Sequence, residues 1–205
     1  VLDVGANIGF FTLLAARCVG PDGRVLAVEP LADNARLLLA SLKVNDFRQV
    51  TLVPVAIDDK PGMVEFGRSF TNGMVNDLTA ATPDEALAAE FLPALPLEAI
   101  LAGEPRLDCI KIDIEGFEYR ALSSARERIA RDRPMIVSEF SPPALQASSG
   151  VSGEAYLDLL FELGYQVGVI RDDGEVAEYC RQAEPLMRHF HDAGTDHIDI
   201  LAKAE

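Results

Sequence analysis

The first eleven residues, VLDVGANIGFF, constrain the fold more than any other stretch of this 205-residue chain. Residues 1–4 are largely apolar and predict a short buried strand, while Gly5, Asn7 and Gly9 permit a tight turn directly after it. The apolar residues from Phe10 onward recur with helical spacing. A strand, a glycine-punctuated turn and a helix in this order are typical of α/β domains that bind a nucleotide-like cofactor at the turn.

The rest of the chain repeats this alternation of strand and helix. The predicted strands are residues 1–4, 24–30, 50–59, 62–66, 107–118, 134–140, 165–170 and 197–203. The main predicted helices are residues 10–19, 35–45 and 156–164, and a further helix that follows residue 118 and runs through residue 130. Because strands that alternate with helices form a mostly parallel sheet covered on both sides, we expect an α/β fold with helices on both faces.

Length and composition indicate a single domain. A chain of 205 residues with 49% hydrophobic and 25% charged residues can bury one full core. We therefore expect one domain over residues 1–205. The chain starts at Val1, inside the first predicted strand and without an initiator methionine, so we expect this domain to be N-terminally truncated at that strand.

The charge and the cysteines restrict the partners and the compartment. A net charge of -15 repels the phosphates of nucleic acids and anionic membrane surfaces. The sequence contains neither an apolar run of about 18 residues nor a signal peptide. Cys18, Cys109 and Cys180 lie far apart and form no CxxC pair, which is typical of a reduced protein. We expect a cytoplasmic protein that binds neither nucleic acid nor membrane.

The pattern of the glycine turn separates the cofactor classes. A dinucleotide site requires G-x-G-x-x-G, but Asn7 and Phe10 occupy the second and third glycine positions, and no P-loop sequence occurs. The observed D-x-G-x-N-x-G fits S-adenosylmethionine, whose amino-acid portion and ribose lie across such a turn. Glu29 follows the turn by about 20 residues and ends the second predicted strand, where an acidic side chain accepts hydrogen bonds from ribose hydroxyls. The alternative for Glu29 is a solvated carboxylate at a helix start.

Four motifs in order resemble the FkbM family of S-adenosylmethionine-dependent methyltransferases: VLDVGANIGFFTLLAA, VLAVEP, VPVAI, and IKIDIEGFE followed by RPMIVSEF. The resemblance implies a Rossmann-like, seven-stranded, mostly parallel sheet with an antiparallel last strand. It also implies O-methylation of small molecules or sugar-containing metabolites. On this basis the expected cofactor-binding residues are Asp3, Gly5, Ala6, Asn7, Gly9, Glu29, Pro30, Ala56 and Asp113.

The fourth motif supplies candidate catalytic carboxylates. Side chains alternate along a strand, so Lys111, Asp113 and Glu115 are predicted to share one face. Lys111 and Asp113 can simply neutralise each other in a two-sided sheet. Glu115, at the predicted carboxyl end, and Asp113 are the better candidates for function, because ligands of open parallel sheets bind at that edge.

Methyl transfer to oxygen requires a group that accepts the hydroxyl proton. Glu139, near the end of the predicted strand at residues 134–140, is one candidate, and His189, His191 and His197 lie in a predicted loop between the last two strands. The candidate catalytic residues are Asp113, Glu115, Glu139 and His197. The alternative for the histidines is an exposed loop without a role.

Two further interpretations concern metal ions and a turn. His189, His191, Asp113 and Glu139 are ligand types that suit a divalent cation, but their spacing matches no zinc signature, so we predict no metal site. Residues 70–78, FTNGMVNDL, predict a turn that either folds over the cofactor or acceptor or is a plain hairpin turn.

The sequence thus predicts an S-adenosylmethionine-dependent methyltransferase that acts on a hydroxyl of a small metabolite or glycan. Two alternatives remain open: a cofactor-binding module without catalysis, and an NAD-dependent oxidoreductase. The sequence contains no signal for the oligomeric state.

Overall fold

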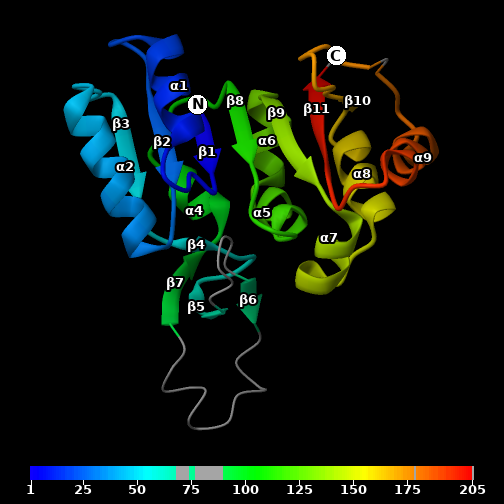
Figure 1. The fold of residues 1–205 in the computed structure, drawn as a ribbon, viewed down its shortest axis with the longest axis horizontal. Coiled ribbons are helices and arrows are strands. Elements are labelled where there is room, and N and C mark those ends of the chain that lie inside the picture. Colours follow the sequence, from blue (N-terminus) through cyan, green and yellow to red (C-terminus); the bar gives the residue numbers. More distant parts are fainter. Residues whose placement is uncertain (68–73, 77–89, 178, 205) are drawn as a thin grey trace, which may run out of the picture.

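A seven-stranded sheet forms the centre of the computed structural model, which describes residues 1–67, 74–76, 90–177 and 179–204. The strand order is β10-β11-β9-β8-β1-β2-β3 (Figure 1). The strands are β1 (Leu2–Val4), β2 (Val25–Val28), β3 (Val50–Val53), β8 (Cys109–Ile112), β9 (Met135–Phe140), β10 (Tyr165–Val169) and β11 (Ile198–Ala204). Strands β3, β2, β1, β8 and β9 pair in parallel, and β11 runs antiparallel to both of its neighbours. This arrangement confirms the predicted α/β fold with an antiparallel last strand.

Helices cover both faces of this sheet. They are α1 (Phe10–Val19), α2 (Ala32–Val44), α4 (Leu97–Leu101), α5 (Glu118–Ser124), α6 (Arg126–Asp132), α7 (Pro142–Ser149), α8 (Gly153–Glu162) and α9 (Ala183–Ala193). Strand β2 shows the two faces, because alternate side chains of a strand point to opposite sides. Val25 and Ala27 pack with residues of α1 and α2, whereas Leu26 and Val28 belong to the large cluster that includes α4, α5 and α8.

A second, four-stranded sheet was not predicted. It has the order β4-β7-β5-β6 and consists of β4 (Ala56–Ile57), β5 (Gly62–Gly67), β6 (Met74–Asn76) and β7 (Glu90–Leu95). The predicted strand at 62–66 corresponds to β5. Figure 1 shows this sheet beyond the carboxyl ends of the central strands, so its first strand lies beside the edge where ligands of parallel sheets bind.

The predicted strand at residues 50–59 is wrong. It divides into β3, which belongs to the central sheet, and β4, which belongs to the second sheet. Pro54 stands between them, and a proline has no N–H with which to continue a strand ladder. The chain therefore changes sheets at this residue.

Two helical predictions also need correction. The helix predicted through residue 130 consists of α5 and α6, separated at Ala125. The segment predicted as a loop with His189 and His191 is instead part of α9. Leu186 and Phe190 explain the second correction: they are four residues apart and buried, which gives α9 an apolar face against the core.

Candidate functional site

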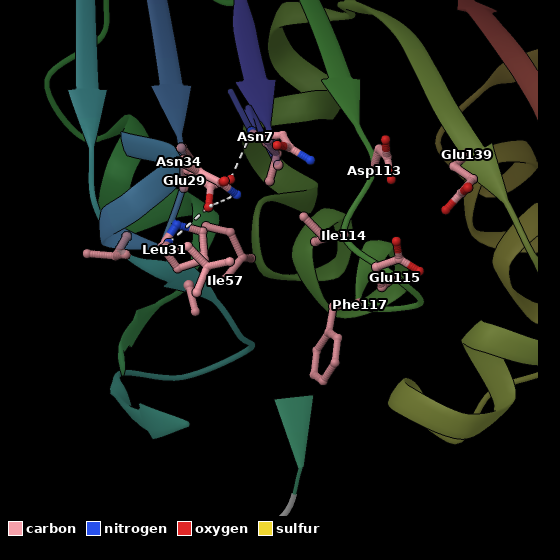
Figure 2. Close-up of a pocket in the computed structure, with 16 residues that line it drawn as sticks. Asn7, Glu29, Leu31, Asn34, Ile57, Asp113, Ile114, Glu115, Phe117 and Glu139 are labelled. Carbon is pink, nitrogen blue, oxygen red and sulfur yellow. Dashed lines mark hydrogen bonds between the residues drawn. The ribbon is translucent and has the colours of Figure 1, made fainter. Parts of the chain in front are cut away.

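A cleft lies at the carboxyl ends of β1, β2 and β8 (Figure 2). Its walls come from four places that are distant in the sequence: the glycine turn after β1, residues 28–34 around the end of β2, residues 55–57 near β4, and residues 113–117 after β8. Glu139 of β9 completes the cleft on the side away from β2. The cleft thus occupies the edge of the sheet that the sequence predicted for ligand binding.

The glycine turn is held by close contact with the segment after β8. Gly5 has φ 78, a left-handed conformation that favours glycine, and a Cβ atom here would collide with the backbone carbonyl oxygen of Asp113. The backbone N–H groups of Gly5 and Ala6 both donate hydrogen bonds to the carbonyl oxygen of Val28. The turn is therefore fixed against β2 on one side and against the β8 segment on the other.

Glu29 is fixed by three hydrogen bonds. Its Oε2 accepts from the backbone N–H of Asn7 at 2.8 Å, and its Oε1 accepts from the backbone N–H of Leu31 at 2.9 Å and from Nδ2 of Asn34 at 3.2 Å (Figure 2). The residue is only 4% exposed, yet it lines the cleft. Because these donors set its position, Glu29 presents its carboxylate to the cleft in one orientation rather than as a free surface group.

The predicted cofactor-binding residues divide into two groups. Gly5, Asn7, Glu29, Pro30, Ala56 and Asp113 line the cleft. Three others support the turn: Asp3 is fully buried and accepts a hydrogen bond from Thr12, Ala6 is buried, and Gly9 precedes α1 in a left-handed conformation against Leu38.

The sequence analysis missed the apolar part of the cleft. This part has two halves. Close to Glu29 it is lined by Leu31 and Ile57, and on the segment after β8 it is lined by Ile114 and Phe117 (Figure 2). Their signal was weak, because single apolar residues in connecting segments do not differ in pattern from ordinary core residues.

The side-chain alternation predicted for the strand at residues 107–118 ends earlier than expected. Strand β8 stops at Ile112, and the following residues form a turn in which Glu115 has φ 56 and Gly116 has φ 94. The backbone N–H of Ile114 donates to Oε1 of Glu118, which the sequence analysis did not single out. Burial raises the pKa of the Glu118 carboxyl. This buried side chain therefore supports the turn that carries Asp113 and Glu115.

Three carboxylates converge on the side of the cleft away from Glu29. One oxygen each from Asp113, Glu115 and Glu139 lies within 4.8 Å of the others. Burial, followed by the negative charges of Asp113 and Glu115, raises the pKa of Glu139 to about 8. Three of the four predicted catalytic residues thus meet, and Glu139 is placed to take up or release a proton near neutral pH. Such oxygen ligands also suit a hard divalent cation, and the absence of a metal stays a prediction.

His197 reaches this group of carboxylates from the start of β11. Its Nδ1 lies 3.6 Å from Oε1 of Glu139 and 2.8 Å from Oδ1 of Asp196. Burial lowers the pKa of His197, but the hydrogen bond to Asp196 and the charge of Glu139 outweigh it, so the pKa is raised overall. His189 and His191 are exposed on α9, which corrects the expectation that the three histidines form one cluster.

A family profile described as "Methyltransferase FkbM domain" matches residues 3–167. The chain belongs to the FkbM methyltransferase family. The FkbM match covers the glycine turn, Glu29 and all three carboxylates, whereas His197 lies beyond it. No curated protein matches the chain.

Solved structures share the fold of this FkbM domain. A methyltransferase FkbM from Methylobacillus flagellatus is 18% identical, with a TM-score of 0.58 over 98% of this chain and 42% of that chain. Fibrillarin from Aeropyrum pernix, in complex with natively bound S-adenosyl-L-methionine, is 14% identical, with a TM-score of 0.51 over 98% of this chain and 64% of that one. This chain therefore spans less than half of the FkbM structure that it resembles.

Two further predictions concern membrane-spanning helices and the turn at residues 70–78. Among the described residues, no helix is both long and apolar enough to cross a membrane. Of the predicted turn at residues 70–78, only Met74–Asn76 is described, as β6, and the rest lies outside the described residues.

Proposed function

We propose that this FkbM-family chain is an S-adenosylmethionine-dependent methyltransferase that methylates a hydroxyl of a small metabolite or glycan. The observation that supports this most strongly is the placement of Glu29 and of the three carboxylates on different sides of one cleft. The first side suits a nucleoside, and the second suits the removal of a proton from a hydroxyl.

The residues of the cleft fit the proposed cofactor. Glu29 offers a carboxylate for the two ribose hydroxyls, and the apolar side chains of Leu31, Ile57 and Phe117 offer a surface for a purine ring. Gly5 lines the cleft as well, and its glycine turn packs closely against the backbone of Asp113. When bound, S-adenosylmethionine supplies an electrophilic methyl group on a sulfonium.

The chain's own contribution to methyl transfer is position and proton removal. The acceptor oxygen must face the methyl group in line, with water excluded, and must lose its proton as the new bond forms. Glu139 is the best general base on this side of the cleft, because its raised pKa of about 8 gives its ionised form more basicity than an ordinary carboxylate has. His197, 3.6 Å from Glu139, is placed to take part in passing that proton to solvent.

The charge of the cleft bears on the acceptor. Among the described residues that line it, Glu29, Asp113, Glu115 and Glu139 are acidic and none is basic. An acceptor that carries a phosphate or a carboxylate would meet several negative charges there. A neutral or cationic polyol, such as an unphosphorylated sugar unit, therefore suits this side better.

The proposal is tested with methyl-labelled S-adenosylmethionine and a panel of neutral, amino- and phosphosugars and small alcohols. We expect saturable binding of the cofactor, no displacement by NAD, and label transfer to a neutral or amino-bearing member of the panel. Binding without transfer to any panel member would favour the non-catalytic module. Displacement by NAD would favour the oxidoreductase.

A further inference from the structure

Lys111 contacts both sides of the cleft although its side chain does not line it. It lies on β8 in register with Asp3 of the neighbouring strand β1, so the two side chains point to the same face of the sheet. Its side chain is 16% exposed, and Nζ donates a hydrogen bond of 2.9 Å to the backbone carbonyl oxygen of Gly5. A partly buried ammonium thus holds the glycine turn directly.

The same ammonium pairs with a buried carboxylate. Oδ1 of Asp3 lies 3.6 Å from Nζ of Lys111. Asp3 is fully buried, and its Oδ1 has no hydrogen-bond partner within the described part of the chain. A buried carboxylate without a counter-ion is costly, so part of the role of Lys111 is to balance Asp3.

A third contact reaches the acceptor side. Oδ2 of Asp113 lies 3.5 Å from Nζ of Lys111, and the Asp113 side chain is 44% exposed in the cleft. Charge balance alone needs only one of the two aspartates. The simultaneous contacts with Gly5 and Asp113 connect the turn proposed to bind the cofactor with one of the carboxylates proposed to act on the acceptor.

We propose that Lys111 is a positioning residue, whose ammonium fixes the Gly5 turn and the Asp113 carboxylate relative to each other. The expected consequence, that Lys111 aligns the cofactor with the acceptor, rests on the proposed function. The geometry that it describes exists without ligand.

The competing explanation is that Lys111 serves only to balance the charge of Asp3. Four variants separate the two: Lys111→Met, Asp3→Asn, the double variant Lys111→Met/Asp3→Asn, and the control Lys43→Met at an exposed position of α2. Lys111→Met alone leaves a buried carboxylate without its partner and is expected to be unstable. The double variant removes both charges, so its unfolding temperature should recover toward that of Asp3→Asn.

The decisive readout is amide hydrogen exchange of residues 4–10 and 112–117 in the ligand-free chain. Several amides in these segments are hydrogen-bonded, among them those of Gly5, Ala6 and Asp113, so they report whether the turn is held. We expect exchange in the double variant to be about threefold or more faster than in Asp3→Asn, with Lys43→Met unchanged. Equal exchange in the double variant and Asp3→Asn would overturn the proposal, because charge balance alone would then explain Lys111.

Binding of S-adenosylhomocysteine, measured by calorimetry, separates this inference from the proposed function. If the wild-type chain binds, we expect the double variant to bind about tenfold more weakly than Asp3→Asn, since the turn is no longer fixed. Equal affinity of those two variants would contradict the positioning role. If the wild-type chain does not bind, the proposed function fails, and the exchange measurement alone decides the role of Lys111.

Discussion

The two sides of the cleft use the same chemical group in opposite ways. Glu29 is held by three N–H donors from Asn7, Leu31 and Asn34, so its surroundings favour one fixed position. On the other side, Glu139 is largely buried and faces Asp113 and Glu115, whose charges repel its own more than His197, at 3.6 Å, attracts it. A carboxylate surrounded by donors is suited to binding, whereas one surrounded by carboxylates is suited to exchanging protons near neutral pH.

The largest effect is expected on the acceptor side. Glu139→Gln should lower turnover by about 100-fold, because an amide accepts no proton from the hydroxyl. In the wild-type chain, turnover should rise with pH as Glu139 loses its proton, up to its pKa of about 8, and this rise should be absent in the variant. Initial rates of S-adenosylhomocysteine formation between pH 6 and about 9, with the exposed Glu154→Gln as a control, test this. An unchanged pH profile in Glu139→Gln would remove Glu139 from the chemistry.

The junction between the two sides is tested at Gly5. Gly5→Ala should destabilise the chain by about 3 kcal/mol, because the new Cβ collides with the backbone of Asp113 in addition to the strain of a positive φ. Gly150→Ala is a matched control: Gly150 is also left-handed, with φ 69 and ψ 20, but a Cβ there meets nothing within 4 Å. Urea unfolding should show a cost of only about 1 kcal/mol for the control. Equal costs at the two sites would mean that the close approach at Gly5 does not matter.

The binding side is tested at Glu29. Glu29→Ala should weaken S-adenosylhomocysteine binding by about 1 to 3 kcal/mol, because the ribose hydroxyls lose a charged acceptor and three donors lose their partner. Calorimetry measures this, with Glu154→Ala as the control for a surface glutamate. An affinity equal to that of the wild-type chain would show that Glu29 is only structural.

The burial of Glu139, together with the negative charges beside it, has a consequence for stability. Folding raises the pKa of Glu139 from 4.5 to about 8, so the folded chain binds more protons than the unfolded chain between these values. This contribution therefore makes the folded chain lose stability as the pH rises from about 4.5 to 8, by on the order of 2 kcal/mol once solvent screening of the partly exposed carboxyl is allowed for. Glu139→Gln should remove that loss and be the more stable protein at pH about 8.5, as urea unfolding at several pH values would show. A wild-type loss that persists in the variant must come from other groups.

The smallest effect concerns the apolar surface near Glu29. Arg120 lies over the ring of Phe117, at 5.3 Å, and pairs with Asp58 at 3.3 Å, so it links the segment after β4 to a residue that lines the cleft. Arg120→Met should weaken S-adenosylhomocysteine binding by less than about 1 kcal/mol, since both contacts are partly exposed. Calorimetry against Arg36→Met, at an exposed position of α2, measures the difference. A loss as large as that of Glu29→Ala would mean that Phe117 contributes more than the carboxylate.

The sequence predicted the parts of the site that local chemistry dictates. Gly5 needs a left-handed φ and a close backbone approach, and only glycine meets both needs, so its position is visible in the pattern. Glu29 was found because an acid at the end of the second strand has a fixed relation to the turn. The mostly parallel sheet with helices on both faces followed from the alternation of strands with helices.

The rest of the fold and of the site depends on contacts between segments that are distant in the sequence. The meeting of Glu139 with Asp113 and the triple contact of Lys111 arise from the register of β8 with its neighbours, which no local pattern contains. The second sheet is not visible in the sequence, because residues 50–53 and 56–57 form one continuous apolar pattern although they belong to different sheets. His189 was misplaced because only Leu186 and Phe190 of α9 are buried, and two apolar positions among many polar residues are too few to indicate a helix.

A crystal structure of the chain with bound S-adenosylhomocysteine tests the central claim most directly. We predict that both ribose hydroxyls contact the Glu29 carboxylate and that the sulfur lies nearer to Asp113 than to Glu29. A nucleoside bound elsewhere, or bound in this cleft with its sulfur directed away from the carboxylates of Asp113, Glu115 and Glu139, would contradict the account.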